Sequence, residues 1–339
     1  KTAYSYDDLH RVAVLETADA TGKSLSKQEY SYDGESNRTK LVENGNRTID
    51  YSYDSLDQLL GVQYPGGTAQ QSLSFEYDAF GNRTKIKTPF SETAYSYSST
   101  SDELASLTVN ARLKTDFTYD GNGSLTGESI SRLGTSIRAT NYSWDSQGRL
   151  SQISYGSLSR PSYLSPFQNN VLQFAYDDSG NRIRKSVNNI AAYYLNDGLR
   201  VLNEMNSAGD VTKTIVHGLE QIAEIDSQGV ITYVHSDILG SAILLTDENG
   251  VVLQEYEYDV FGSILGMNGS NETNYLFTGQ EYDSESELYY YNARYYNPRL
   301  GRFLSRDVLI GRDGDILSRN RFAYVKNNNK SVHFIGLVY

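Results

Sequence analysis

A short aromatic motif recurs along this chain, and this repeat limits the possible folds more than any other feature of the sequence. The motif is two aromatic residues separated by one residue and followed by aspartate, often with glycine, asparagine and a basic residue after it. Nine copies occur, of which the one at Tyr95 lacks its aspartate; they begin at Tyr4, Tyr30, Tyr51, Phe75, Tyr95, Phe117, Tyr142, Phe174 and Tyr256. The early copies recur every 20 to 26 residues or so, and a fixed period of this length indicates a repeat architecture.

Each copy predicts an antiparallel hairpin. The two aromatic residues stand at i and i+2, so their rings lie on the same face of a strand. Aspartate, glycine and asparagine favour a turn, because aspartate bonds the backbone two positions on and the other two accept a positive φ. After Asn82, residues 83–87 alternate between basic and less polar side chains, as a return strand would. A period that holds two strands and a turn predicts a curving ribbon of stacked hairpins.

The composition supports an all-β fold made of these hairpins. The chain has 29 tyrosines and 28 glycines, and 38% of its residues are hydrophobic. Disordered chains are poor in aromatic residues, whereas tyrosine favours strands. Its hydroxyl also allows the ring to lie on a sheet face that is partly exposed to water. The nearest helical pattern is at residues 101–111, where Ser101 would cap a helix with Leu104 and Leu107 on one face. That segment is too short to define a helical domain.

Charge and residue counts exclude several classes of function. The formal net charge is −12, which nucleic acid or an anionic membrane surface would repel. The absence of cysteine excludes disulfides and thiolate metal sites. No apolar run approaches the length that spans a membrane. The chain enters the repeat at Tyr4, so we expect a segment of a longer polypeptide whose export signal, if any, lies upstream.

The last third of the chain carries a denser set of motifs. Aromatic residues crowd residues 288–298, and the stretch 301–307 reads Gly-Arg-Phe-Leu-Ser-Arg-Asp. The motif residues that we single out are Tyr233, His235, Asp237, Gly240, Tyr258, Asp259, Phe277, Gly279, Tyr282, Asp283, Tyr291, Arg294, Tyr295, Gly301 and Phe303. Together with the repeats, this region resembles the core segment of the Rhs, or YD-repeat, family of bacterial polymorphic toxins. It also resembles the C component of insecticidal toxin complexes and, more distantly, the teneurin ectodomain.

The resemblance covers essentially the whole chain and is most specific over residues 233–307. It implies a β-ribbon that spirals into a hollow shell, which in the bacterial members holds a variable C-terminal toxin. The implied division is a YD-repeat ribbon at residues 1–232 and a core segment at 233–339 that tucks inward and plugs one end. The implied partners are the chain's own C-terminal cargo, upstream shell segments and a secretion or delivery component, with a secreted or cell-surface location.

The resemblance also implies an aspartyl autoprotease that cuts after the leucine of an Asp-Pro-x-Gly-Leu stretch. Two carboxylates that share a proton supply the base and the acid for this hydrolysis. Asp307, with Arg306 beside it, matches the first aspartate, and Leu337 matches the cleavage site. The second aspartate position falls on His333 or Phe334, and both prolines are missing. We therefore predict a degraded or inactive protease.

Alternatives remain open for Asp307 and its neighbours. Asp307 is either a turn or salt-bridge carboxylate or a residual catalytic group, and Asp313 or Asp315 is a candidate substitute for the missing carboxylate. Three functions therefore compete: an encapsulating shell, a cell-surface adhesion or carbohydrate-binding module with outward-facing rings, and a single-turnover autoprotease.

No cofactor or metal is expected. The histidines His10, His217, His235 and His333 are scattered, and no phosphate loop or Ser-His-Asp signature occurs. His235 and Asp237 share a strand face, which suits either a metal or proton relay or, as we prefer, packed hydrogen bonds. The stretch after Asp120 is similar to a calcium loop but lacks the EF-hand spacing, so we predict a turn.

Overall fold

The computed structural model describes residues 1–65, 72–156 and 170–328. Its main element is one 24-stranded sheet in which every strand pairs antiparallel with the next along the chain. The sheet is therefore an uninterrupted series of hairpins, as the repeat predicts. The all-β, antiparallel hairpin class expected from the sequence is confirmed.

The strands of the sheet are short, as a repeat of this period requires. The first twelve are β1 (Thr2–Tyr6), β2 (Val12–Ala18), β3 (Ser24–Tyr32), β4 (Arg38–Glu43), β5 (Arg47–Tyr53), β6 (Leu59–Gln63), β7 (Ser72–Tyr77), β8 (Arg83–Lys87), β9 (Glu92–Tyr97), β10 (Leu104–Val109), β11 (Leu113–Tyr119) and β12 (Leu125–Arg132). The others are β13 (Thr135–Trp144), β14 (Leu150–Gly156), β15 (Val171–Tyr176), β16 (Arg182–Val187), β17 (Ile190–Asp197), β18 (Arg200–Met205), β19 (Val211–His217), β20 (Gln221–Asp226), β21 (Ile231–Ser236), β22 (Ala242–Thr246), β23 (Val252–Tyr258) and β24 (Ile264–Gly269). Residues 101–111, the nearest to a helical pattern, contain strand β10.

The predicted aspartate turns connect these strands. The Oδ1 atom of Asp78 accepts hydrogen bonds from the backbone N–H groups of Phe80 and Asn82, both at 2.9 Å. The same two bonds, to residues two and four positions on, occur at Asp7, Asp54, Asp120, Asp145, Asp237 and Asp259. The aspartate carboxylate therefore accepts hydrogen bonds from backbone N–H groups that would otherwise lack a partner in a tight turn. At Asp120 this confirms the predicted turn.

The aromatic rings face inward and tie each hairpin to the one before it. The first aromatic residue is buried in most copies, and the residue between the two rings is exposed at Ser31, Ser52, Glu76, Ser96, Thr118, Ser143 and Glu257. The second aromatic residue donates its hydroxyl or indole hydrogen to a backbone carbonyl of the preceding hairpin. These pairs are Tyr32–Val12, Tyr53–Arg38, Tyr77–Leu59, Tyr97–Arg83, Trp144–Leu125, Tyr176–Leu150 and Tyr258–Ala242.

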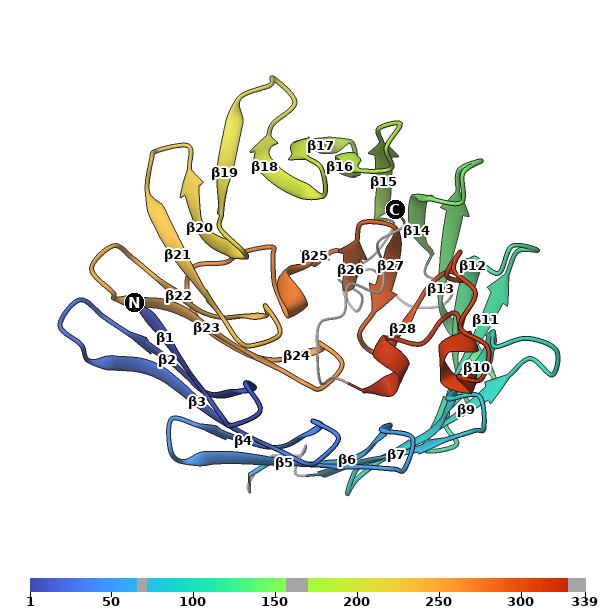
Figure 1. Cartoon of the computed structure of the whole chain (residues 1–339). Helices are drawn as coiled ribbons and strands as arrows, with labels where there is room; N and C mark the ends of the chain where they lie inside the picture. Colours follow the sequence, from blue (N-terminus) through green and yellow to red (C-terminus); the bar gives the residue numbers. More distant parts are fainter. Residues whose placement is uncertain (66–71, 157–169, 329–339) are drawn as a thin grey trace.

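The sheet wraps around the later part of its own chain (Figure 1). Strands β22–β24 come back toward β1–β6, and an ion pair of 3.3 Å between Arg47 and Glu257 joins the two ends of the sheet. Inside lies a four-stranded sheet of β25 (Glu281–Asp283), β26 (Leu288–Tyr291), β27 (Arg294–Asn297) and β28 (Arg302–Phe303). Three short 3-10 helices, η2 (Phe277–Gly279), η3 (Ile316–Arg319) and η4 (Val325–Asn327), complete this region.

The hydrophobic core lies between the inner face of the large sheet and these later residues. Three clusters of buried side chains form it, and each one combines repeat residues with residues that follow β22. The largest fully buried side chains include Tyr289, Tyr295, Tyr296 and Phe303, all from the inner sheet. The predicted division at residues 232 and 233 stays a prediction, and the large sheet itself continues to Gly269.

Candidate functional site

Residues 273–328, called the inner segment below, contact the turn edge of the large sheet. The turn edge is the rim formed by the turns that follow the odd-numbered strands. Side chains of the inner segment make five hydrogen bonds to backbone carbonyls in four of these turns: Tyr289 to Gly262, Tyr296 to Phe261, Tyr290 to Gly180, Asn327 to Gly81 and Asn328 to Asp57. The inner segment therefore joins hairpins that lie far apart in the sequence.

A buried charge cluster holds the inner segment to the middle of the sheet. Arg182, at the start of β16, pairs with Glu281 at 2.7 Å and with Asp283 at 2.6 Å. Lys185 pairs with Asp283 at 2.9 Å. Burial opposes the charge of Asp283, but Arg182 and Lys185 hold the pKa of this carboxyl below its usual value. Two cations thus balance two carboxylates in a site with almost no solvent exposure.

Glycine is required where the inner segment presses on the turn edge. At Gly262, which has a φ of +90°, an added Cβ would lie 2.4 Å from the ring of Phe277. At Gly301, with a φ of +65°, it would lie 2.4 Å from the guanidinium of Arg83. Gly301 therefore belongs to the motif because Arg83 of the repeat packs against its backbone.

The other predicted motif residues fill this interface. Tyr291 bonds Thr278 and Tyr324 through its hydroxyl, Tyr295 accepts from Arg182, and the Phe303 ring lies 3.7 Å from the Arg294 guanidinium. Tyr282 packs on Tyr289, Gly279 lies against Gly240, and Tyr233 pairs with Thr246 across β21 and β22. The structure brings most of the predicted motif together, in a packing role.

Asp307 is held by an arginine other than the one predicted. Its Oδ2 atom pairs with Arg294 at 2.7 Å, and its Oδ1 atom accepts from the backbone of Leu309. Burial lowers the pKa of Arg294 to about 10, although Asp307 opposes this effect. Arg306 turns away to Glu103 of the repeat, at 2.6 Å. Asp307 therefore sits in a salt bridge, with Arg294 as its partner.

The remaining protease residues do not assemble around Asp307 in the part of the chain that the structure describes. Asp313 pairs with Arg319, and Asp315 with Lys326, whose side chain lowers the pKa of Asp315. The cleavage-site Leu337, together with His333 and Phe334, lies outside the described residues. The catalytic assignment of Asp307 and Arg306 stays a prediction.

His235 and Asp237 make separate hydrogen bonds. The His235 Nε2 atom lies 3.0 Å from the Thr246 hydroxyl, and burial lowers the pKa of His235 to about 4. Asp237 accepts from the backbone of Leu239 and Ser241, and burial raises its pKa. Within residues 1–65, 72–156 and 170–328, no group of three or more histidine and acidic side chains could hold a metal ion.

Three consecutive hairpins, β17–β18, β19–β20 and β21–β22, lack the second aromatic residue and are called the irregular hairpins below. Their residues at that position are Asn196, His217 and Ser236. Asn196 donates to the Arg182 carbonyl at 3.1 Å and His217 lies 2.8 Å from the Val201 carbonyl, so both reproduce the bond that tyrosine makes elsewhere. They do not fill the space of a tyrosine ring.

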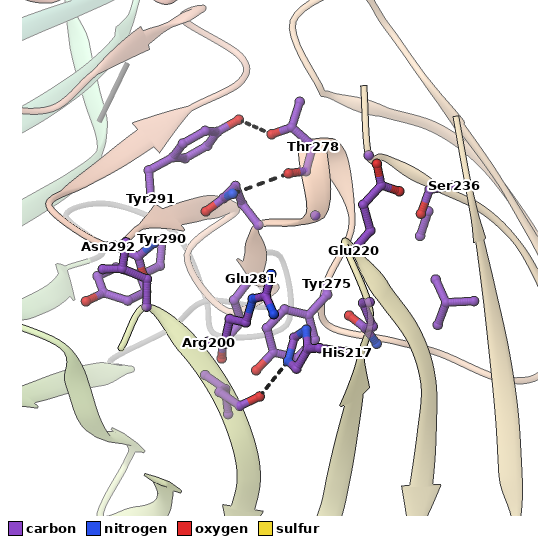
Figure 2. Close-up of a pocket in the computed structure, with 18 of the residues that line it drawn as sticks. Arg200, His217, Glu220, Ser236, Tyr275, Thr278, Glu281, Tyr290, Tyr291 and Asn292 are labelled. Atoms are coloured by element: carbon purple, nitrogen blue, oxygen red, sulfur yellow. Dashed lines mark hydrogen bonds between the residues drawn. The ribbon is translucent and has the colours of Figure 1, made fainter. Parts of the chain in front are cut away.

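A cavity of about 560 Å³ occupies this space, and all three of these residues line it. In Figure 2, Glu220 and Ser236 lie on one side of the cavity, Arg200 and Asn292 on the other, and His217 and Tyr275 between them. The sequence analysis missed this feature. The signal was present, because Asn196 and Ser236 directly precede Asp197 and Asp237, where the repeat places its second ring.

No helix in the described ranges is long and apolar enough to cross a membrane. With the fold and these sites in place, comparison with known proteins identifies relatives. The tRNA3(Ser)-specific nuclease WapA of Bacillus spizizenii is 32% identical over 96% of this chain and 13% of its own length. The toxin protein Tse5 of Pseudomonas aeruginosa is 24% identical over 88% of this chain and 26% of its own length. The chain therefore spans a small part of these relatives.

A solved structure and a family model also match. The crystal structure of TcdB2-TccC3 without its hypervariable C-terminal region aligns with 99% of this chain and 20% of its own, at 18% identity and a TM-score of 0.49. The model of the teneurin YD-shell matches residues 154–330, which is more than half of the chain. This chain belongs to the YD-shell family, the family of repeat shells that includes the teneurin YD-shell.

Proposed function

We propose that this chain is part of a YD-repeat shell that encloses and delivers a C-terminal toxin or effector segment. The observation that carries the proposal is that the sheet wraps around later residues of its own chain, with its aromatic face inward (Figure 1). The wall surrounds 56 residues of its own chain, 273–328, and we infer that the complete shell surrounds a cargo segment in the same way.

The direction of the rings favours the shell over a surface adhesion module. An adhesion or carbohydrate-binding surface needs rings on the outer face, where a ligand can stack on them. The outer face instead carries the exposed residues between the rings and charged pairs such as Lys114–Asp116 and Lys87–Glu76. Tyr4 and Tyr6 of β1 are more exposed than the other rings of the repeat.

The relatives favour the same function. The matched nucleases and the matched toxin are much longer than this chain, which spans 13% and 26% of them. We infer that this chain supplies enclosing wall, that any toxin activity resides in another segment, and that the chain itself is not a turnover enzyme. Its partners would be that cargo segment and further shell segments, in a secreted or cell-surface protein.

The test is limited proteolysis of the full natural polypeptide that contains this sequence. We expect a cargo segment to resist protease until the shell is unfolded. Replacement Asp283→Asn should make that segment sensitive, because it unbalances the charge cluster that holds the inner segment in place. The matched control Asp313→Asn removes an exposed pair and should leave protection intact. Equal cleavage of the cargo in native and unfolded protein would refute encapsulation.

For the protease segment we propose a degraded site. Asp307 has Arg294 as its ionic partner, and the family position of the second aspartate holds His333 or Phe334. The intact mass of the purified natural polypeptide should show no cut after Leu337. A cut there that disappears in Asp307→Asn would establish a working autoprotease.

A further inference from the structure

Two polar groups in the cavity beside the irregular hairpins are not satisfied by the protein. One lacks a hydrogen-bond partner, and the other lacks a counter-charge. The hydroxyl of Tyr275 is buried, with 7% of the residue exposed, and it has no hydrogen-bond partner among the described residues. A buried hydroxyl without a partner is unfavourable, and such groups in native structures usually await water or a ligand. By contrast, Asn196 and His217 are committed to carbonyls of the preceding hairpins.

The second group is the carboxylate of Glu220, an exposed residue at the side of the cavity next to Ser236 (Figure 2). In the described part of the chain it forms no ion pair. The charge that acts on it is that of Asp237, and this charge and partial burial both raise the pKa of Glu220. Burial and, after it, the Glu220 charge raise the pKa of Tyr4 in β1. This end of the cavity is therefore negative and lacks a compensating cation.

The cations of the lining do not supply that compensation. Arg182 is neutralised by Glu281 and Asp283. Arg200 is exposed, and its guanidinium lies 3.5 Å from the Leu219 carbonyl. The rest of the wall is largely apolar or aromatic and includes Leu199, Val201, Ile238, Leu239, Tyr290 and Tyr291. Water solvates Glu220 while the cavity is open. A neutral ligand bound over Glu220 would displace this water without supplying a counter-charge, whereas a cation with an apolar body would suit both parts of the wall.

We propose that this cavity binds an organic ammonium ion with an apolar or aromatic body, with the ammonium group at Glu220 and the body in the space left by the missing tyrosine rings. The volume lies within the usual range for small-molecule sites. Because the space is left by missing tyrosine rings, a ligand ring of phenol size suits it. A hydroxyl on that ring would be a hydrogen-bond partner for Tyr275. The same chemistry is offered by a free amine and by a lysine side chain of an extended peptide. The inference does not rest on the shell function.

The first experiment compares tyramine with tyrosol by isothermal titration calorimetry on the whole chain. The two probes differ only in an ammonium group and a hydroxyl. We expect tyramine to bind at least tenfold more tightly than tyrosol, and Glu220→Gln to remove this difference. The matched control Glu248→Gln changes an exposed turn glutamate and should preserve the difference. Equal binding of the two probes, no binding of either, or a preference that survives Glu220→Gln would overturn the proposal.

A second experiment fills the cavity. Ser236→Tyr restores the aromatic residue that the repeat places there and should abolish tyramine binding without lowering Tm. Its control, Ser227→Tyr, adds a ring at an exposed turn and should bind normally. Undiminished binding to folded Ser236→Tyr would place the ligand elsewhere and contradict the proposal.

The source of the ammonium group is decided by a third titration. It compares a blocked Gly-Lys-Gly peptide with its norleucine counterpart, which lacks the charge. Tighter binding of the lysine peptide than of tyramine would identify a peptide ligand, and the reverse order would identify a free amine. Either order supports the site.

Discussion

The regular and irregular hairpins of this sheet are built on the same backbone pattern and differ in how they fill its inner face. In the regular hairpins, a tyrosine or tryptophan at the second position fills the space between neighbours and bonds the previous hairpin, as Tyr53 does with the Arg38 carbonyl. In the irregular ones, Asn196 and His217 keep the bond and lose the volume. The comparison separates two functions of the second aromatic residue. Its hydrogen bond holds the register between hairpins, and its ring fills the space and excludes water.

The side chains and the free volume around the hairpins also differ between the two regions. Around the irregular hairpins lie Glu204, Lys213, Glu220 and Glu224, and a cavity opens beside them. Around the regular hairpins β3–β8, the inner face is filled by Tyr30, Phe75 and neighbouring apolar side chains and by the buried Arg38 and Arg83, and the cavity beside it is only about 60 Å³. Both regions hold polar side chains, and they differ in the free volume that they leave, about 560 Å³ against about 60 Å³.

The largest expected effect lies where the two regions meet, at Arg182 of the regular hairpin β15–β16, which directly precedes the irregular ones. Replacement by glutamine leaves the carboxylates of Glu281 and Asp283 with Lys185 as their main counter-charge. Removing one partner of a buried ion pair costs about 3–5 kcal/mol, so we expect a loss of that size in the free energy of unfolding. Denaturant unfolding measures it.

The control for this substitution is Arg319→Gln. Arg319 pairs with Asp313, which is almost fully exposed, so the change should stay within about 0.5 kcal/mol. A loss at Arg182 no larger than that at Arg319 would mean that the charge cluster does not join the two regions.

Much of this architecture could be predicted from the sequence, because the repeat encodes it locally. The i and i+2 rings and the aspartate turn specify each hairpin through contacts within it or with its neighbour, as in the bond from Phe80 to Asp78 and the bond from Tyr77 to Leu59, 18 residues away. The inner segment was predicted only through the resemblance. Several of its partners lie 100 residues or more away, as Arg182 does from Asp283, and no local pattern encodes such a pairing.

The candidate sites were harder to predict for the same reason. The sequence suggested Arg306 as the neighbour of Asp307, since the two are adjacent in the chain. The structure instead pairs Asp307 with Arg294 and Arg306 with Glu103, so the two adjacent side chains have different partners. The cavity forms where three successive repeats lack the second aromatic residue. A search for matches to the motif does not detect residues that are missing from it.

The second prediction concerns the pH dependence of the irregular region. Burial raises the pKa of Glu204 from 4.5 to about 7; Lys213 opposes this effect, and the carboxylates of Glu281 and Glu224 add to it. The folded protein then holds this proton more tightly than the unfolded chain. Stability from this group is complete below about pH 4.5 and is lost as the pH rises through about 7.

Glu204→Gln should therefore stabilise the protein at pH 8, by up to about 3 kcal/mol, and by less at pH 5. Denaturant unfolding at the two pH values measures the difference. Glu248→Gln, at an exposed turn, should show the same stability as the natural protein at both. If Glu204→Gln had the same effect at pH 5 and pH 8, Glu204 would not be the titrating group.

The smallest expected effect tests the hydrogen bond of the regular hairpins by itself. Tyr53→Phe keeps the ring and removes the hydroxyl that donates to the Arg38 carbonyl at 2.9 Å. A hydrogen bond of this kind contributes about 1 kcal/mol to the free energy of unfolding. Tyr193→Phe, which removes a hydroxyl from a ring that is 37% exposed, is the control and should change stability by less than about 0.5 kcal/mol. If both variants behaved alike, the ring would account for the whole role of the second aromatic residue. Asn196 and His217 would then have no reason to keep the bond, and the separation of the two functions would fail.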